Sequence, residues 1–545
     1  MSRSMQPLTF TNLKEAFLFS SDQFTNRPFL NNDKGICLTF GQVKKLALLL
    51  SEKIRETGIG KDDKVAILSE NNPFWPIAYF AIILSDATAV PILPEFTAEE
   101  VHILLNHSEA KGIIASTKQL IKIDTCSPFA VFEITEKEIV SLSRTTATKS
   151  VEKRVDPSDI ASIIYTSGTT GTPKGVMLSH DNFIQNTNGC LNVQDVNIND
   201  VFLSILPLAH AYEFTIGFLL PMVAGSTIHY LSKPPTPSTL IPALSLIRPT
   251  TMLTVPLIME KIFKNGIKPK LTDSVIKRTI YSTTLGRKLM HYIAGKELKQ
   301  KFGGRIRFFG VGGAKLDGET ERFLNEAKFP YSIGYGMTEA APLIAGSPPK
   351  KTKLYSTGKV VLNQEVKINN PDPKTGIGEI WAKGRNIMTG YYKLPELTNE
   401  LISPDGWLKT GDLGKLRHNG YLYICGRVKN IILGSNGENI YPEDIEAILN
   451  RHQLVADSLV YEIKGKLIAK VQLNQQELEQ KYREILVAAS ELHQELERKI
   501  EEVLIELQIY VNSQVNRSSK LSLVLIQAEP FEKTPTLKIK RYLYI

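Results

Sequence analysis

An apolar strand runs into a loop of small residues and one lysine in the segment Ile163-Ile164-Tyr165-Thr166-Ser167-Gly168-Thr169-Thr170-Gly171-Thr172-Pro173-Lys174-Gly175. Small residues let a backbone curl around phosphate oxygens, to which amide and hydroxyl groups donate hydrogen bonds while a lysine adds positive charge. The segment is not a Walker A loop, because it lacks a Gly-Lys-Ser or Gly-Lys-Thr ending. It indicates a triphosphate-binding loop of another kind, and a Gly- and Thr-rich turn between strands is the alternative.

Upstream of this loop, helix and strand patterns alternate along the chain. Apolar periodicity predicts helices at residues 39–57 and 74–84, and Thr97 with Glu100 forms a capping box that starts a third helix. Short apolar runs predict strands at 65–68, 89–93 and 112–115. Strands that alternate with helices predict an α/β fold with a parallel, helix-covered sheet.

The length of 545 residues is too great for one hydrophobic core and predicts two or more domains. Apolar residues make up 42% and charged residues 22%, which is typical of a globular protein and excludes wholesale disorder. The four cysteines, at 37, 126, 190 and 425, are scattered without metal spacing. This pattern favours neither disulfides nor zinc and is typical of the reducing cytoplasm.

The formal net charge of +9 suits an anionic partner such as ATP, CoA, an acidic carrier protein or a lipid surface, without choosing among them. A generally solvated basic surface is an equal alternative. The first nine residues lack the apolar core of a secretory signal. Pro221 and Gly225 interrupt the apolar run at 214–231, so we expect this run to form core structure and not a membrane span.

The C-terminal part carries one apolar stripe at steps of three or four residues, which predicts a long helix or two helices in series. The stripe consists of Leu478, Tyr482, Ile485, Ala489, Leu492, Leu496, Ile500, Val503 and Leu507. It is short for a coiled coil, so we expect it to pack within a C-terminal domain.

The segment from Tyr165 to Gly175 resembles the phosphate-loop signature of the adenylate-forming (AMP-binding) superfamily, which includes acyl-CoA synthetases, firefly-type luciferases and peptide-synthetase adenylation domains. Further motifs follow in the order of that family, so the resemblance covers nearly the whole chain. It implies a large N-terminal domain of parallel and mixed sheets covered by helices, at residues 1–426. It also implies a small, mobile α+β lid domain at 427–545.

The resemblance assigns nucleotide contacts to the phosphate loop, namely to Thr166, Ser167, Gly168, Thr169, Thr170, Gly171 and Lys174. In the motif Tyr335-Gly336-Met337-Thr338-Glu339, it implies that Tyr335 and Gly336 lie at the adenine, that Thr338 contacts phosphate and that Glu339 coordinates Mg²⁺. A carboxylate suits this role, because a hard cation that bridges triphosphate oxygens prefers oxygen ligands. Gly313 and Ala314, within Gly312-Gly313-Ala314-Lys315, are expected beside the adenine and the acyl pocket.

Further motifs of the family lie towards the C-terminus. Trp407-Leu408-Lys409-Thr410-Gly411-Asp412 matches its aspartate motif, in which Asp412 can accept hydrogen bonds from two ribose hydroxyls. The resemblance implies that Arg427 contacts ribose or phosphate and that Lys429 is the hinge. It also implies that the loop at 434–442 reaches the site during the thiol step.

The segment Lys533-Thr534-Pro535-Thr536-Leu537-Lys538-Ile539-Lys540-Arg541 resembles the end of the family that carries the adenylation lysine. Lys538 is the predicted catalytic lysine, with Lys540 in reserve and an ordinary basic tail as the alternative. His210 is expected to flank the acid's carboxylate, although a lone histidine is often structural. The predicted catalytic set is therefore Lys538, Lys174, Thr338 and His210.

The resemblance therefore implies a ligase of fatty acid and lipid metabolism that uses ATP, Mg²⁺ and CoA. The acid's carboxylate attacks the α-phosphorus of ATP, pyrophosphate leaves, and a thiol then displaces AMP from the acyl-adenylate. A long-chain fatty acid–CoA ligase is expected, with the run at 214–223 helping to wall an apolar acyl tunnel.

Three alternatives remain. An acyl–acyl carrier protein synthetase would use the same adenylate chemistry, and a luciferase-like oxidase would consume oxygen. A non-catalytic nucleotide-binding scaffold is disfavoured, because Lys174, Glu339, Asp412, Arg427 and Lys538 are all present. No nucleic-acid partner is expected. The expected location is the cytoplasm, with peripheral contact at the inner membrane face.

Overall fold

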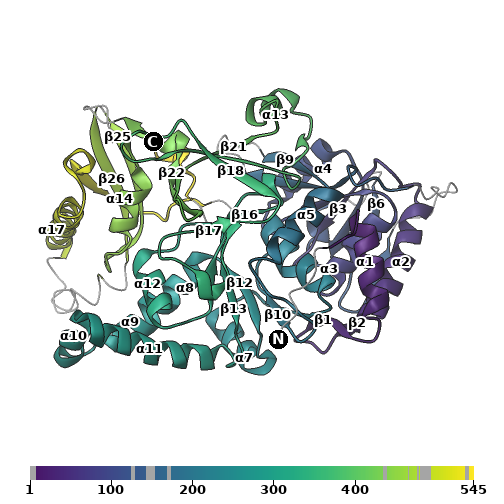
Figure 1. Ribbon diagram of the computed structural model, residues 1–545, viewed down its shortest axis with the longest axis horizontal. Coiled ribbons are helices and arrows are strands. Elements are labelled where there is room, and N and C mark those ends of the chain that lie inside the picture. Colours follow the sequence, from purple (N-terminus) through teal and green to yellow (C-terminus); the bar gives the residue numbers. More distant parts are fainter. Residues whose placement is uncertain are drawn as a thin grey trace. The chain divides into compact units, whose positions relative to one another are not determined.

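The computed structural model describes residues 8–123, 129–142, 154–167, 173–433, 439–463, 465–474, 478, 492–533 and 539–545 (Figure 1). Two compact units can be distinguished. The first comprises Met1–Lys367, Trp381–Lys409 and Arg417–Leu422, and the second comprises Ile368–Ile380, Thr410–Leu416 and Tyr423–Ile545. The sequence-based boundary after residue 426 stays a prediction.

The predicted α/β alternation is confirmed in an eight-stranded sheet of the first unit, ordered β20-β9-β8-β4-β3-β5-β6-β7. Its inner strands β8, β4, β3, β5 and β6 are parallel, whereas β20, β9 and β7 pair antiparallel with their neighbours. In sequence order the strands are β3 (Lys64–Leu68), β4 (Thr88–Ile92), β5 (Ala110–Ser116), β6 (Ala130–Ile134), β7 (Ile139–Ser141), β8 (Ile160–Ser167), β9 (Pro173–Ser179) and β20 (Gly390–Tyr391).

Five α-helices lie in the described part of residues 8–190; the second, third and fourth match the helices predicted from the sequence, and the other two were not predicted. The five helices are α1 (Leu13–Gln23), α2 (Phe40–Glu56), α3 (Phe74–Leu84), α4 (Ala98–Ser108) and α5 (His180–Cys190). All residues of α3 are buried, since the helix is apolar on every side. The predicted capping box at Thr97 and Glu100 forms both of its hydrogen bonds.

A second, seven-stranded sheet of the first unit has the order β14-β13-β12-β10-β11-β1-β2 and is parallel except for the β1–β2 hairpin. Its strands are β1 (Pro28–Asn32), β2 (Cys37–Thr39), β10 (Val201–Ser204), β11 (Thr227–Tyr230), β12 (Thr251–Thr254), β13 (Phe308–Val311) and β14 (Tyr331–Ile333).

The apolar run at 214–231 lies in the core, as the interruption by Pro221 and Gly225 predicted. It forms most of the π-helix η2 (Glu213–Leu219), helix α6 (Leu220–Val223) and strand β11, and its aromatic residues Phe214 and Phe218 are buried. Across the described ranges, no helix combines the length and the apolar character needed to cross a membrane.

Helical segments connect the last four strands of this seven-stranded sheet: α7 lies between β11 and β12, α8 to α11 lie between β12 and β13, and α12 lies between β13 and β14. The helices are α7 (Pro237–Ile247), α8 (Pro256–Lys261), η3 (Ile262–Ile267), α9 (Lys268–Leu271), α10 (Val275–Ser282), α11 (Thr284–Lys301) and α12 (Gly318–Glu326). The cluster formed by Met259, Phe263, Leu298, Phe309 and Phe323 anchors these segments on β13 and its neighbours.

Seven strands form a third sheet in the order β15-β16-β17-β22-β21-β19-β18. They are β15 (Tyr335–Gly336), β16 (Leu343–Gly346), β17 (Gly358–Val360), β18 (Gln364–Asn369), β19 (Gly378–Gly384), β21 (Leu408–Leu416) and β22 (Tyr421–Arg427). The short helices of this region are η4 (Thr338–Ala340), η5 (Pro349–Lys351), α13 (Pro395–Leu401) and η6 (Val428–Asn430).

The second unit has a three-stranded sheet of its own, β25-β26-β27, and a small hairpin, β23-β24. Its C-terminal elements are β23 (Ile432–Leu433), β24 (Asn439–Ile440), α14 (Pro442–Leu449), β25 (Val455–Ile463), β26 (Lys466–Leu473), α17 (Leu492–Asn512), η7 (Arg517–Ser519), β27 (Leu523–Ile526) and η8 (Arg541–Leu543). Val503 and Leu507 of the predicted apolar stripe are buried in the core of this unit, as expected. Tyr482, Ile485 and Ala489 of the stripe lie outside the described residues.

Candidate active site

The phosphate-loop segment lies between two paired strands of the first unit. Strands β8 and β9 are antiparallel, with Thr166 opposite Lys174 and Ser167 opposite Pro173. A strand and not a helix follows the loop, so the chain does not lead from the loop into a helix N-terminus as it does in a Walker A motif. Residues 168–172 lie outside the described ranges, so the contacts assigned to Gly168, Thr169, Thr170 and Gly171 stay predictions.

Lys174 and Glu339 meet at one buried tyrosine. The ammonium of Lys174 lies over the ring of Tyr391, 5.8 Å from its centroid, and the Tyr391 hydroxyl donates a 2.7 Å hydrogen bond to Glu339 Oε1. Tyr391 reaches this position because β20 pairs with β9, which sets Tyr391 opposite Val176. A cation within about 6 Å of a ring centroid is attracted by the ring, so this phenol binds a positive and a negative group at once.

Burial and the neighbouring carboxylate of Glu339 raise the pKa of Tyr391, so its hydroxyl remains a hydrogen-bond donor at neutral pH. Tyr391 is 6% exposed and Glu339 is 9% exposed. In such a water-poor setting, the hydrogen bond orients the carboxylate strongly.

The turn that carries Glu339 is held by polar side chains from distant parts of the chain. The amides of Asn186 and Asn386 donate to Ala340 O at 2.9 Å and 2.7 Å. The backbone N–H of Met388 donates to Glu339 O at 2.9 Å. The position of Glu339 is therefore fixed by its backbone as well as by its side chain.

Other predicted residues lie at the carboxyl ends of parallel strands, along one edge of the seven-stranded sheet that contains β10, β13 and β14. Gly313 and Ala314 follow β13, Tyr335 follows β14, and His210 follows β10. The N–H of Gly334 donates to Val311 O, which joins the ends of β13 and β14 directly. This edge is where α/β sheets commonly bind ligands.

Two glycines at this edge have steric reasons to be glycine. Gly313 has φ +88°, a left-handed conformation that disfavours other residues. A Cβ on Gly336 would lie 2.0 Å from Pro342 O, so only glycine fits between this strand and the next. Thr338 and His210, by contrast, are half-buried and lie on segments that follow the strand ends.

Asp412 and Arg427 meet within the second unit. Arg427 Nε lies 3.1 Å from Asp412 Oδ1, and the Asp412 backbone N–H donates to Thr410 Oγ1 at 3.1 Å. The aspartate side chain is 11% exposed and the arginine side chain is 47% exposed. The structure thus joins the two residues predicted at the ribose, while their contact with a nucleotide stays a prediction.

The sequence of residues 18–392 matches the family described as AMP-binding enzyme. The chain belongs to this family. The resemblance inferred from the motifs is therefore confirmed.

Curated relatives of this AMP-binding enzyme include "Long chain acyl-CoA synthetase 4" of Arabidopsis thaliana, which is 27% identical over 85% of this chain and 78% of the relative. Another is "Long-chain-fatty-acid--CoA ligase heimdall" of Drosophila melanogaster, 28% identical over 83% of this chain and 74% of the relative.

Solved structures of similar fold include ATP-bound MatB from Rhodopseudomonas palustris, with a TM-score of 0.76, 21% identity and coverage of 98% of both chains. O-succinylbenzoate coenzyme A synthetase (MenE) from Bacillus subtilis in complex with AMP gives a TM-score of 0.74, with 22% identity and 97% coverage of both chains. At such identities these structures confirm the fold class alone.

Other predicted residues of this AMP-binding enzyme are not placed at a site. Lys538 and residues 434–438 lie outside the described ranges. Lys429 is exposed on η6 between β22 and β23, and Lys540, the reserve lysine, lies 3.4 Å from Glu532. The roles of Lys538 as catalyst and Lys429 as hinge stay predictions.

Sequence reasoning missed several residues that hold the candidate site. Tyr391 belongs to no motif that we recognised, and the buried Asn186 stands in a helix whose sequence shows no chemical pattern. Asn71 donates to Leu206 O at 2.6 Å and accepts from the Leu208 N–H at 2.9 Å, which fixes the segment leading to His210. The neighbours of Asn186 and Asn71 in the sequence are themselves polar, so no local pattern marked these asparagines as buried.

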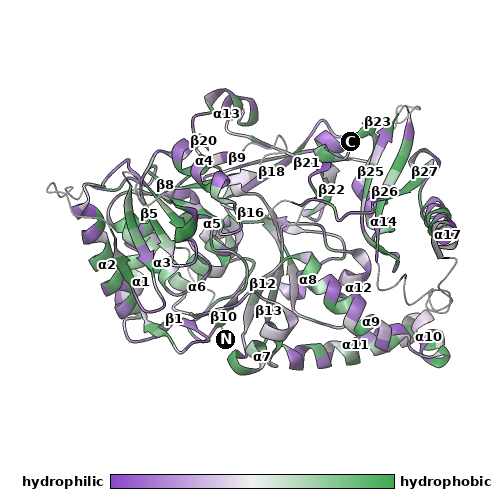
Figure 2. Cartoon of the chain, turned by 180° about the vertical axis from the view of Figure 1, so that it is seen from behind, coloured by the Kyte–Doolittle hydropathy of each residue, from purple (hydrophilic) through white to green (hydrophobic). Residues whose placement is uncertain are grey.

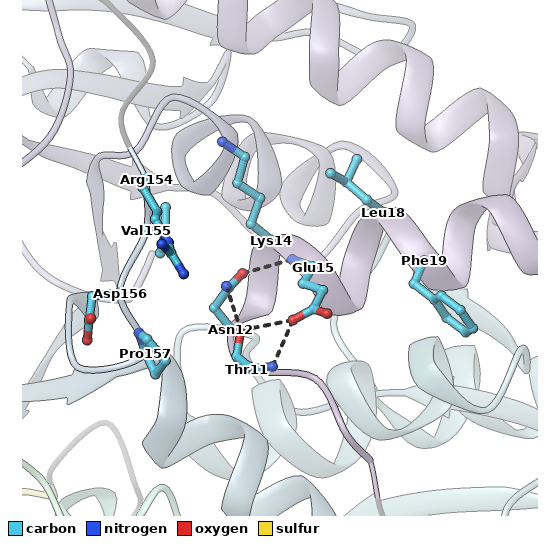
Figure 3. Close-up of a pocket in the computed structure, with 10 residues that line it drawn as sticks. All are labelled: Thr11, Asn12, Lys14, Glu15, Leu18, Phe19, Arg154, Val155, Asp156 and Pro157. Carbon is cyan, nitrogen blue, oxygen red and sulfur yellow. Dashed lines mark hydrogen bonds between the residues drawn. The ribbon is translucent and has the colours of Figure 1, made fainter.

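Two cavities differ in their relation to this site. A groove of about 680 Å³ at the start of α1 is lined by residues such as Asn12, Lys14 and Glu15 together with residues 154–157, and by none of the predicted site residues (Figure 3). A small apolar cavity of about 20 Å³ is lined among others by Tyr212, Ile216, Gly310 and Gly334, so it borders the strand ends described above. We assign the candidate site to that edge of the sheet, because none of the predicted site residues lines the groove.

Proposed function

We propose that this chain is an ATP-dependent acid–thiol ligase that converts a long-chain fatty acid to its acyl-adenylate and then to acyl-CoA. The names of the plant and insect relatives support this reaction class and the long-chain acid. The single observation that carries the proposal is the group of Lys174, Tyr391 and Glu339, which places a cation and an oriented carboxylate on one buried phenol.

In the first half-reaction, a carboxylate oxygen of the acid attacks the α-phosphorus and the bond to pyrophosphate breaks. Glu339 fits the binding of Mg²⁺, because this cation commonly takes one or two protein carboxylates and completes its shell with phosphate oxygens and water. Mg²⁺, when bound, would offset charge on the triphosphate. Lys174 adds a fixed positive charge for the leaving pyrophosphate, and Tyr391 keeps the Glu339 carboxylate oriented.

The acid and the ribose would be bound by residues of different elements. Asp412 would accept hydrogen bonds from the ribose hydroxyls, Arg427 would contact the ribose or a phosphate, and His210 would lie at the acid's carboxylate. Lys538 would bridge the carboxylate and the α-phosphate, since two anions otherwise repel each other. In the second half-reaction the CoA sulfur attacks the acyl carbon, AMP leaves, and movement about Lys429 would replace Lys538 by the loop at 434–442.

The proposed acyl site would require side chains to move, because the cavity beside the run at 214–223 is too small for an acyl chain. Most of the run at 214–223 packs in the core, and Ile216 alone of this run lines the cavity of about 20 Å³. That volume is about the space of one water molecule, so Tyr212 and Ile216 would have to move to admit an acyl chain. Each methylene then buried contributes about 0.8 kcal/mol, which would favour long acids.

Thioester formation by the purified chain tests the function. The chain is supplied with ATP, Mg²⁺ and either palmitate or acetate, and then with CoA or acyl carrier protein. We expect pyrophosphate release with palmitate and thioester with CoA. Thioester with the carrier protein alone would favour that acceptor, and oxygen consumption would favour an oxidase. Absence of pyrophosphate with every acid would favour a nucleotide-binding scaffold.

Peripheral contact with a membrane is also part of this proposal.

Glu339→Gln tests the metal assignment. A neutral amide is a poor ligand for a hard cation, so we expect Mg²⁺-dependent pyrophosphate release to fall by roughly 10²–10³. Glu109→Gln is a matched control. Glu109 also accepts a hydrogen bond from a tyrosine hydroxyl, that of Tyr392 at 2.8 Å, but Glu109 is exposed. Equal activity of the two variants would remove Glu339 from the metal site.

A further inference from the structure

Three helices of the first unit expose an unusual number of large apolar side chains. Helix α10 has no buried residue, and its Val275 and Ile276 are 72% and 73% exposed. On α11, Leu285 and Leu289 are 84% and 60% exposed, and Leu246 of α7 is 80% exposed. Further exposed apolar residues on the same helices are Ile241, Ile280, Tyr292 and Ile293. We call these nine residues the apolar edge.

The exposed apolar residues of helix α11 share one face of that helix. Its buried residues His291, Ala294, Gly295 and Leu298 follow a helical spacing that faces the core. Leu285, Leu289, Tyr292 and Ile293 lie on the opposite side of the same helix. Helices α10 and α7 both contact α11, and the three follow one margin of the first unit (Figure 1). Seen from behind, apolar and polar residues alternate along this margin (Figure 2).

The positive charge of the chain is concentrated in the same region. Residues 256–301 contain eleven Lys and Arg against three Asp and Glu, a net charge of +8 out of +9 for the whole chain. Lys288, Lys296 and Lys299 are exposed on the side of α11 that carries the apolar residues. Lys296 lies over the ring of Tyr292 at 4.6 Å, so cations and apolar groups are interleaved.

We propose that the apolar edge with these lysines docks on the surface of an anionic phospholipid bilayer. Interfacial helices bury large apolar side chains at the boundary of head groups and acyl chains, while lysines beside them meet the negative lipid surface. A second copy of the chain is a poor occupant, because it would bring the same net charge of +8. The inference rests on the peripheral membrane contact proposed above and assigns a surface to it. This surface contains none of the candidate site residues, so the docking does not depend on the proposed catalytic activity.

Vesicle sedimentation of the full chain tests the docking. Wild-type protein should sediment with vesicles of phosphatidylcholine and phosphatidylglycerol. It should sediment less with phosphatidylcholine alone, and added salt should release part of the bound protein. Equal binding to both kinds of vesicle, or binding to neither, would overturn the proposal.

Two double variants separate the apolar and the charged contributions. Leu285→Ser with Leu289→Ser should weaken binding to the anionic vesicles by roughly tenfold or more, because two large apolar groups are lost. Lys288→Gln with Lys299→Gln should weaken it by about fivefold for each lysine.

Matched controls come from elsewhere in the chain. Ile505 and Ile509 of α17 have the same spacing as Leu285 and Leu289 and are 57% and 65% exposed. Replacing both by serine should leave binding unchanged, as should Lys137→Gln with Lys374→Gln, which alters two other exposed lysines. Equal loss in the controls would overturn the assignment. The oligomeric state without lipid gives a second check. If the wild-type chain forms an oligomer that only the double variant Leu285→Ser with Leu289→Ser dissociates, the apolar edge joins copies of the chain and the proposal is overturned.

Discussion

At the residue scale, Tyr391 has the most specific role that the structure adds to the candidate site. Its phenol ring lies under the Lys174 ammonium, and its hydroxyl donates to Glu339. The residue contributes no charge of its own, because its pKa is raised by burial and by the neighbouring carboxylate. We therefore regard Tyr391 as a positioning residue for the proposed metal ligand.

Tyr391→Phe should remove this orientation and keep the ring. Hydrogen bonds to charged groups contribute about 1.5–3 kcal/mol, so the Mg²⁺ concentration for half-maximal pyrophosphate release should rise about tenfold or more. The rate at saturating Mg²⁺ should fall less. Tyr392→Phe, which removes a hydroxyl bonded to exposed Glu109, is the control. An unchanged metal requirement in Tyr391→Phe would contradict the positioning role.

Glu213 is a second buried residue, and its ionisation affects how the stability of the protein depends on pH. The residue is 1% exposed, and Oε2 of its carboxyl has no hydrogen-bond partner among the described residues. Burial raises the pKa of Glu213 to about 8, although a hydrogen bond from Ser204 opposes this shift. The folded protein therefore holds a proton here that the unfolded chain releases at a lower pH.

The pH dependence of stability follows from this shift. The contribution of Glu213 is fully present below its ordinary pKa of 4.5 and is lost as the pH rises towards 8. Glu213→Gln should remove this loss, so the variant should be more stable than wild type at pH 8 and similar at pH 4.5. Urea unfolding of both proteins at several pH values measures this difference in the free energy of unfolding. Parallel pH profiles of the two proteins would show that Glu213 ionises normally.

At the element scale, the turn between β15 and β16 depends on close backbone approach. Gly336 passes so near Pro342 that any side chain would collide with the Pro342 carbonyl. The same turn carries Thr338 and Glu339 and is bonded to α5 through Asn186. Displacement of this strand would therefore move the proposed metal ligand and not merely loosen the fold.

Gly336→Ala should consequently lower both the thermal midpoint and the rate of pyrophosphate release, with activity falling at least tenfold. Gly266→Ala is the control, because a Cβ at Gly266 of η3 would meet nothing within 4 Å. That variant should be neutral or slightly stabilised, since alanine favours helices. A fully active Gly336→Ala protein would show that the turn tolerates the displacement.

At the scale of the whole molecule, the proposed reaction proceeds in two half-reactions. Lys174, Tyr391 and Glu339 belong to the first unit, and Asp412 and Arg427 belong to the second. The predicted exchange of Lys538 for the loop at 434–442 would let one enzyme perform two half-reactions in turn. This exchange makes the two steps separable by mutation.

Lys538→Ala should slow adenylate formation by roughly 10²–10³, because its charge acts where carboxylate and phosphate meet. Formation of thioester from supplied acyl-AMP should be nearly unchanged. Both steps are followed in the same preparation, by pyrophosphate exchange and by acyl-CoA formation. Lys540→Ala is the control, since Lys540 lies beside Glu532. Equal slowing of both steps, or arrest by Lys540→Ala alone, would exclude Lys538 as the adenylation lysine.

The sequence by itself determined the features that depend on neighbouring residues. The helix at 74–84, the cap at Thr97 and the alternation of strands and helices were predictable, because periodicity and capping act within a few residues. The family was predictable as well, because its phosphate-binding motif is a contiguous segment. Only the tertiary structure joined Glu339 to Tyr391 and Ala340 to Asn186, residues that are 52 and 154 positions apart. These contacts arise from strand pairing and from the packing of α5, and no local pattern encodes such pairings.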